Sequence, residues 1–148
     1  MAETLGSLCD KLTIIKLKQW HSTDKTKLKS LQDQCKKLSD EIDEYLFGAA
    51  SGQISPEKIK SISNKVYKEA DNPTREFLGT IGSIASELAA VNCALWHEQE
   101  KVYEFDKVPA TDKDSVIKKL AILNLERNKC IESIDANLFE IIIRVNKG

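Results

Sequence analysis

The polar residues best suited to bind a ligand lie on two predicted helices, over residues 73–105 and 111–146. Arg127 interrupts the apolar stripe of the second helix, so its guanidinium is expected to face or border the core. An arginine is always charged and needs acceptors where it is buried. Glu87 is its candidate partner, because antiparallel pairing of the two helices brings it near residues 127–132. The candidate set is Arg127, Glu87, Asn92, Asn124, Asn128 and Trp96.

Two interpretations of this set stay open. It lines a site for a small anionic ligand, or it forms a buried polar network that fixes the register of the helices. Asn92 and Trp96 share a helix face at i, i+4. Asn124 and Asn128 have the same spacing. We favour the network, because buried polar groups that satisfy one another can specify how helices align.

Acidic residues three apart offer a different chemistry. The equivalent pairs on two helices are Asp40 with Asp43, and Glu132 with Asp135. Acids on facing helices hold Mg²⁺, which bridges the protein to phosphate groups. The chain resembles the all-α nucleotide pyrophosphatases in two motifs, Glu41-x-x-Glu44 and Glu132-x-x-Asp135. The resemblance implies a metal-dependent nucleotide hydrolase, although in that family the acids lie on adjacent short helices. The alternative is that these acids form the solvated faces of two helices.

The two tryptophans and two histidines of the chain occur as Trp20-His21 and Trp96-His97. Each histidine is followed three residues later by a carboxylate, a spacing that puts both groups on one helix face and suits a divalent metal. We favour the structural alternative, in which each tryptophan plugs an end of the core and its histidine lies at the rim. The chain has no Gly-rich phosphate loop, no H-E-x-x-H and no nucleophile elbow.

Long helices must position these residues. Apolar residues at three- and four-residue steps predict helices over 4–21, 24–47, 73–105 and 111–146, with a shorter helix over about 56–71. Ser55-Pro56 and Asn72-Pro73 mark two helix starts. Gly48 is the residue expected just past the end of the second helix. The two clearest stripes are Leu28, Leu31, Cys35, Leu38, Ile42, Tyr45 and Phe77, Ile81, Ile84, Leu88, Val91, Leu95.

The two halves of the chain repeat one pattern. Sliding Gly6-Ser7-Leu8 onto Gly82-Ser83-Ile84 also places Trp20-His21 on Trp96-His97. A longer shift places Ile42-Asp43 on Ile134-Asp135, and Leu46-Phe47 on Leu138-Phe139. We therefore predict an all-α, up-and-down-type four-helix bundle of two duplicated hairpins, over about 4–48 and 73–146, joined by the crossover helix in a single domain spanning 1–148.

Composition excludes several classes of protein. The 148 residues include 22 basic and 23 acidic ones, and the formal net charge of -1 gives no overall field for nucleic acid or an anionic membrane. No apolar run approaches the roughly 18–20 residues of a membrane span, and the first residues do not resemble a secretory signal. The four cysteines are widely spaced, as expected of reduced core thiols. A soluble, cytoplasmic protein is predicted.

Two stretches resemble the signatures of a bacterial all-α family that has no assigned activity. The first signature, L-x-x-x-N-x-x-L-W-x-x-E, matches Leu88, Asn92, Leu95, Trp96 and Glu100. The second, L-N-x-x-R-N-x-x-I-x-x-I-D, matches Leu123, Asn124, Arg127, Asn128, Ile131, Ile134 and Asp135. The chain departs from the family at His97-Glu98, where an acidic pair more often follows the tryptophan. The resemblance implies a fold and no particular reaction.

Three functions remain as hypotheses. The first is a non-enzymatic helical interaction or scaffold protein, without a cofactor, that binds a protein partner or a second copy of itself. A homodimer is preferred, because the helices over 73–105 and 111–146 are longer than the one over 24–47 and their ends would otherwise project. The others are a bundle that binds a small anionic ligand at Arg127 and a metal-dependent nucleotide hydrolase that uses the acidic pairs.

Overall fold

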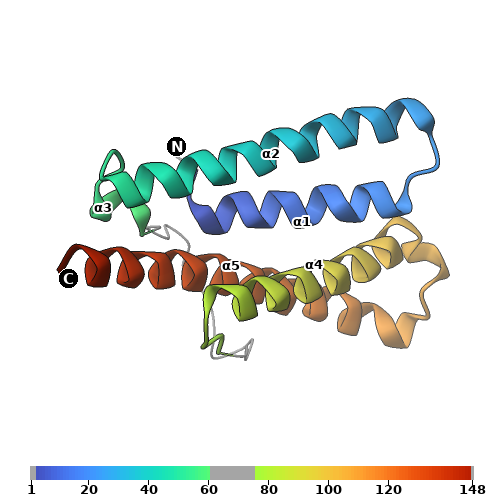
Figure 1. Ribbon diagram of the computed structural model, residues 1–148. Helices are drawn as coiled ribbons and strands as arrows, with labels where there is room; N and C mark the ends of the chain where they lie inside the picture. Colours follow the sequence, from blue (N-terminus) through green and yellow to red (C-terminus); the bar gives the residue numbers. More distant parts are fainter. Residues whose placement is uncertain (1–2, 61–75, 148) are drawn as a thin grey trace.

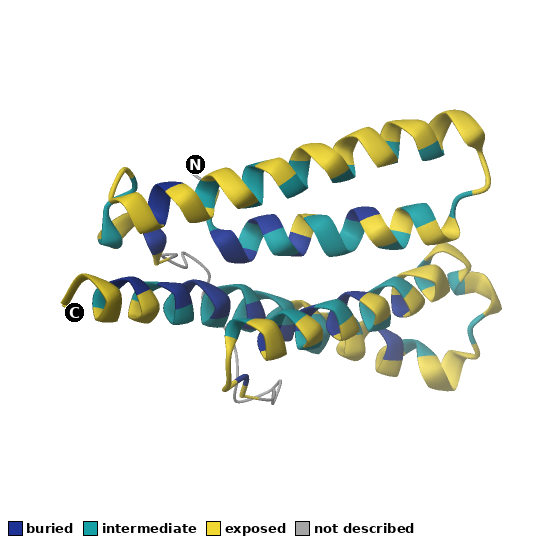
Figure 2. Cartoon of the chain, in the orientation of Figure 1, coloured by how far each residue is buried: buried dark blue, intermediate teal, exposed yellow. Residues whose placement is uncertain are grey.

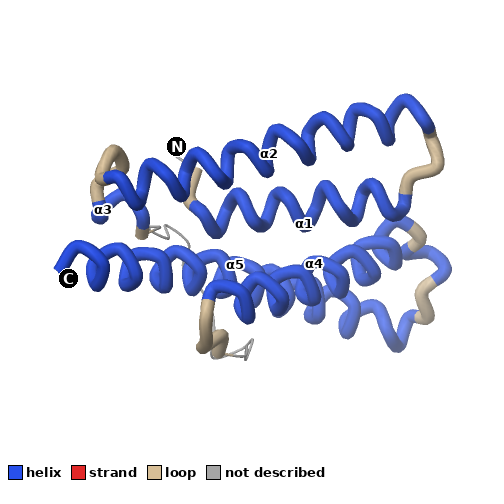
Figure 3. Tube along the Cα trace, viewed as in Figure 1, coloured by secondary structure: helices blue, strands red, loops and turns tan. Residues whose placement is uncertain are grey.

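The computed structural model describes residues 3–60 and 76–147, and all regular structure in these ranges is helical (Figures 1 and 3). The helices are α1 (Leu5–His21), α2 (Lys25–Ser51), α3 (Pro56–Ile59), α4 (Ile81–Tyr103) and α5 (Ala110–Lys147), with a 3-10 turn at Phe105–Lys107. The predicted all-α class is confirmed.

The four long helices form two antiparallel hairpins. In Figure 1, α1 and α2 run in opposite directions, and so do α4 and α5. Helix α1 lies between its partner α2 and the second hairpin, since it packs against α2, α4 and α5. Helix α2, in contrast, packs mainly on α1, and the short α3 packs on α5. The outer position of α2 determines which surfaces stay open to solvent.

The core is built mostly from α1, α4 and α5. Figure 2 shows buried residues along these helices, while α2 is largely exposed except near its C-terminal end. The buried cluster is Leu5, Ala49, Ile59, Phe77, Ile84, Leu88, Val91, Cys130, Ile134, Leu138 and Ile142. Every member of the predicted α2 stripe, from Leu28 to Tyr45, is only half-buried. The stripe therefore faces inward but is not fully covered.

Helices α1 and α4 begin with the same cap. The hydroxyl of Thr4 accepts a hydrogen bond from the Ser7 backbone N–H, and that of Thr80 accepts one from the Ser83 backbone N–H, each over 3.3 Å. These bonds satisfy amide groups that a helix start leaves without an intrahelical partner. Gly79, with φ of 144°, sits just before the second cap in a conformation that favours glycine.

The cap at Thr80 corrects the predicted start of the third long helix. Residues 76–79 are not helical, and α4 begins at Ile81 rather than at 73. The prediction was wrong because Phe77 continues the apolar spacing of α4 although it lies in a loop. Phe77 is nevertheless buried, and its carbonyl oxygen accepts a hydrogen bond from the Ser133 hydroxyl over 3.0 Å. The Asn72-Pro73 signal lies outside the described residues.

The end of α2 and the crossover helix also differ from expectation. Helix α2 continues through Gly48 to Ser51, and Gly52, with φ of 86°, ends it instead. Gly48 is buried against Ile54, and the alanines after it are strong helix formers. The crossover helix α3 ends at Ile59, because Lys60 is extended. The rest of the predicted 56–71 helix lies outside the described residues.

Candidate functional site

Arg127 of α5 binds Asp10 of α1. Its Nε donates to Asp10 Oδ1 over 2.8 Å and its Nη2 to Asp10 Oδ2 over 2.6 Å, which is the two-pronged geometry of strong arginine–carboxylate pairs. The side chain of Asp10 is 7% exposed and that of Arg127 is 31% exposed. Hydrogen bonding to Asp10 raises the pKa of Arg127, against the opposing effect of burial. The charge of the guanidinium is thus met within the protein.

Asn92 of α4 completes this cluster. Its Nδ2 donates to Asp10 Oδ1 over 3.0 Å and to the Thr13 hydroxyl over 3.2 Å. The four side chains therefore join α1, α4 and α5. Glu87 was expected to be the partner of Arg127, but the guanidinium hydrogen bonds of Arg127 end on Asp10, because α5 packs against α1 as well as α4.

Sequence reasoning missed Asp10 because it is off the apolar stripe of its helix. Leu5, Leu8 and Ile15 bury one face of α1, and Gly6 and Asp10 are buried on the opposite face. A helix packed on one side only would leave that second face in water. Since α1 lies between α2 and the second hairpin, its off-stripe residues are covered too. A lone acid on an otherwise basic helix is the only signal that the sequence offers.

The other predicted members of the set have different surroundings. Asn128 donates to the Asn124 backbone carbonyl oxygen one turn earlier on α5, over 2.9 Å, and Asn124 is exposed. Glu87 is half-buried on α4. Trp96 stacks on His21 of α1, with ring centroids 4.7 Å apart. The structure thus brings together Arg127 and Asn92 from the predicted set and adds Asp10 and Thr13.

Asp135 is a fully buried cap for the start of α1. Its Oδ1 accepts a hydrogen bond from the Gly6 backbone N–H over 2.8 Å, and its side chain comes from the middle of α5. A carboxylate is favourable at this place, because the start of a helix carries partial positive charge. Burial, followed by the negative charge of Asp135, raises the pKa of the Cys9 thiol and of the Tyr45 hydroxyl.

The acidic pairs are not arranged as one metal centre. Asp40 and Asp43 are exposed on α2, Glu132 is half-buried, and Asp135 is occupied at the start of α1. Across residues 3–60 and 76–147, no group of three or more His, Cys, Asp or Glu side chains could hold a metal ion. The arrangement gives the hydrolase hypothesis no geometric support.

We expect millimolar Mg²⁺ or Mn²⁺ to leave the Tm within about 1 °C of its metal-free value, because only a ligand that prefers the folded state stabilises it. The double variant Asp40→Asn/Asp43→Asn is the proper control. Both side chains are exposed, whereas replacement of Asp135 would damage the α1 cap. A larger shift that this double variant abolishes would revive the hydrolase hypothesis.

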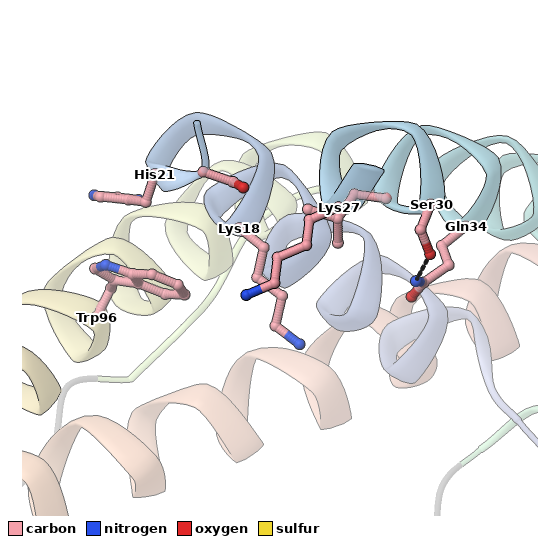
Figure 4. Close-up of a pocket in the computed structure, with 8 residues that line it drawn as sticks. Lys18, His21, Lys27, Ser30, Gln34 and Trp96 are labelled. Atoms are coloured by element: carbon pink, nitrogen blue, oxygen red, sulfur yellow. Dashed lines mark hydrogen bonds between the residues drawn. The ribbon is translucent and has the colours of Figure 1, made fainter. Parts of the chain in front are cut away.

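A groove runs between α1 and α2 and ends at Trp96. Figure 4 shows the side chains that line the hollow at its Trp96 end. It consists of two adjoining hollows of about 420 and 380 Å³ that share Lys18 and Gln34. The first is also lined by His21, Ser22, Lys27, Ser30, Leu31 and Trp96. The second is also lined by Lys11, Ile14, Ile15, Lys37, Leu38 and Glu41. We call this surface the α1–α2 groove.

His21 and Trp96 close one end of the α1–α2 groove. The His21 Nδ1 lies 2.8 Å from the Leu17 carbonyl oxygen, to which it donates, and its Nε2 lies 3.9 Å from a carboxylate oxygen of Glu100. Trp20 was expected to plug the core, but it is 85% exposed, because no described helix covers that side of the last turn of α1. His97 is exposed as well.

The chain matches no family model, no curated protein and no solved structure. Among the described helices, none is both long enough and apolar enough to cross a membrane.

Proposed function

We propose that the chain is a non-enzymatic helical interaction protein that presents its α1–α2 hairpin to a protein partner. The observation that carries the proposal is the incomplete burial of α2. Its stripe residues from Leu28 to Tyr45 are all half-buried, whereas α4 and α5 bury Ile84, Leu88 and Ile134 almost completely. Apolar surface left in water costs about 25 cal/mol per Å². A complex in which a partner covers the exposed part of the stripe is therefore stabilised.

Exposed apolar side chains at the end of α2 also support an interaction role. Leu46, near the end of α2, is 38% exposed at the edge of the stripe, and Phe47 is 70% exposed on another side of the helix. Exposed apolar patches on small proteins commonly mark interaction sites. The ligand hypothesis centred on Arg127 has less support, because Asp10 already takes two hydrogen bonds from the guanidinium.

The duplication and the bundle arrangement belong to the same proposal. We infer that the two hairpins descend from one, arranged as an up-and-down-type four-helix bundle. The shared Thr-x-Gly-Ser caps of α1 and α4, at Thr4 and Thr80, support common descent. We also propose, from the resemblance of residues 88–100 and 123–135 to a bacterial all-α family, that the chain shares the fold of that family.

A reducing, cytoplasmic location and a protein partner are also proposed. All four cysteines carry free thiols, and Cys130 is fully buried among apolar side chains, as in proteins that stay reduced. A second copy of the chain is the alternative partner, and the mass of the purified protein in solution distinguishes the two.

Photo-crosslinking tests the proposed function. A photoreactive amino acid at position 34, inside the α1–α2 groove, is expected to give a discrete higher-mass adduct in the cell that makes the protein. Gln32 is the matched control, because it is exposed on the same helix but does not line the groove. Equal labelling from both positions, or no adduct from position 34, would contradict an interaction role for this surface.

A further inference from the structure

The α1–α2 groove is lined by one face of each helix, so its shape suits a third helix packed between them. On α1 its lining residues follow one face, at positions 11, 14, 15 and 18, and on α2 they follow another, at 27, 30, 31, 34, 37, 38 and 41. These spacings of three, four and seven are those of a single helix face. Two adjacent helices that both leave a face open form a groove into which a third helix packs.

The floor of the groove is apolar. Ile14, Ile15, Leu31 and Leu38 contribute from the two helices, and all except Ile15 are only half-buried. An occupant that removes them from water must itself carry an apolar stripe.

The rim of the groove is basic although the whole chain has a net charge of -1. Lys18 and Lys27 both extend into the hollow beside Trp96 (Figure 4), and Lys37 lines the other hollow. None of the three forms an ion pair with another described residue. Lys11 pairs with Glu3, and Glu41 is the one acid of the groove lining. The positive charge of these lysines is therefore complementary to carboxylates on an occupant of the groove.

Other occupants fit these features less well. The phosphate backbone of nucleic acid would leave the apolar floor of the groove uncovered, and Asp33, Asp40 and Glu44 on the outer face of α2 interrupt the positive surface beyond Lys37. A small anion would leave the apolar floor uncovered. Residues 61–75 of the chain itself hold three basic and two acidic residues, so their charge does not complement lysines.

We infer that the α1–α2 groove binds an acidic amphipathic helix of a second protein. This inference rests on the proposed function and names the chemistry of the partner. The helix lays leucine-type side chains on the apolar floor. Its carboxylates meet Lys27 in the hollow beside Trp96, Lys18 where the two hollows adjoin, and Lys37 in the second hollow. Lys27 and Lys37 are ten residues apart on α2, a separation of about 15 Å. Acids seven to eleven residues apart along the partner helix would therefore meet both ends.

Three fluorescein-labelled peptides of equal length test the inference by fluorescence anisotropy with the purified full chain. The first is an acidic amphipathic helix, and the second is the same helix with every acid replaced by lysine. The third has the same residues as the first, rearranged so that they form no apolar stripe. We expect only the first to bind, with a dissociation constant in the micromolar range that weakens as salt is raised, because salt screens partly exposed charges.

Charge-reversal variants locate the binding. Lys18→Glu/Lys37→Glu is expected to weaken binding of the acidic helix at least tenfold and to create binding of the lysine helix. Lys29→Glu/Lys36→Glu changes the net charge equally at exposed positions outside the groove, and it should bind like the unmodified chain. Unchanged circular dichroism and urea midpoint would establish that both variants fold.

Each contrary outcome has its own meaning. Equal binding of all three peptides, or an equal effect of the two double variants, would overturn the inference. Binding of inorganic phosphate that competes with the acidic helix would make the groove a small-anion site and would also overturn it. Self-association abolished by Lys18→Glu/Lys37→Glu would make a second copy the occupant. Self-association of this kind would leave the proposed function standing and would overturn the inference. An adduct at position 34 with a partner that has no acidic helix would do the same.

Discussion

Gly6→Ala is expected to lower the free energy of unfolding by about 3 kcal/mol, the upper part of the range for overpacking a tight contact. A Cβ atom at position 6 would lie 2.3 Å from the Ile131 carbonyl oxygen, and 3.0 Å from the carbonyl carbon and Cα of the same residue. These are backbone atoms in the middle of α5, so no side chain can rotate away. Separating α1 from α5 would also weaken the hydrogen bond from Gly6 to the buried Asp135.

Gly82→Ala is the matched control for this experiment. Gly82 holds the same place after the cap of α4 that Gly6 holds after the cap of α1, but a Cβ there meets nothing within 4 Å. Because alanine is the better helix former, we expect an unchanged or slightly raised stability, by up to about 1 kcal/mol. Urea denaturation measures the free energy of unfolding of both variants. In thermal denaturation, the Tm of Gly6→Ala should fall by roughly 10 °C. Similar stabilities for the two variants would exclude the close approach of α1 and α5.

Asp10→Asn is expected to lower the free energy of unfolding by about 2–3 kcal/mol. The substitution keeps the shape of the side chain but removes the negative charge that Arg127 faces. The new amide NH2 group is a donor and cannot accept one of the two hydrogen bonds that Arg127 donates. Breaking a fully buried pair costs about 3–5 kcal/mol, and the 31% exposure of the Arg127 side chain reduces that cost. Asn92 would also lose an ionised acceptor.

Glu104→Gln is the control for Asp10→Asn, because it removes a carboxylate from an ion pair whose side chains are 66% and 77% exposed. Such surface pairs contribute about 0–1 kcal/mol. A double-mutant cycle of Asp10→Ala and Arg127→Ala should give a coupling free energy of about 2 kcal/mol in urea denaturation. If Asp10→Asn unfolds at the same urea concentration as Glu104→Gln, the cluster does not hold α1, α4 and α5 in register.

The sequence predicted the helices well where local patterns decide them. Helix α1 begins and ends within a residue of expectation, and α5 begins and ends close to the predicted 111–146. These limits follow from apolar spacing and from residues that favour helix starts and ends, all of which act within a few residues of one another. The start of α4 was missed, because Phe77 matches the spacing of the helix although a glycine at positive φ and a threonine cap intervene.

The candidate site was predicted only in part. Arg127 and Asn92 were recognised as polar residues that need partners, and they do share one in the structure. The partner, Asp10, lies 117 residues from Arg127 in the chain, and no spacing rule connects positions so far apart. The tryptophan of the first hairpin was assigned to the core on the same local grounds, yet it is 85% exposed.

The sequence by itself determined that the chain is helical, where most of its helices run and which stripe of each is apolar. Only the tertiary structure decided that α1 is covered on two opposite faces, that Gly6 and Asp135 meet, and that α2 stays at the edge with a basic groove beside it. The physical reason is the range of the interactions. Helix formation depends on hydrogen bonds and side chains three or four residues apart, whereas burial depends on which distant segment packs against each face.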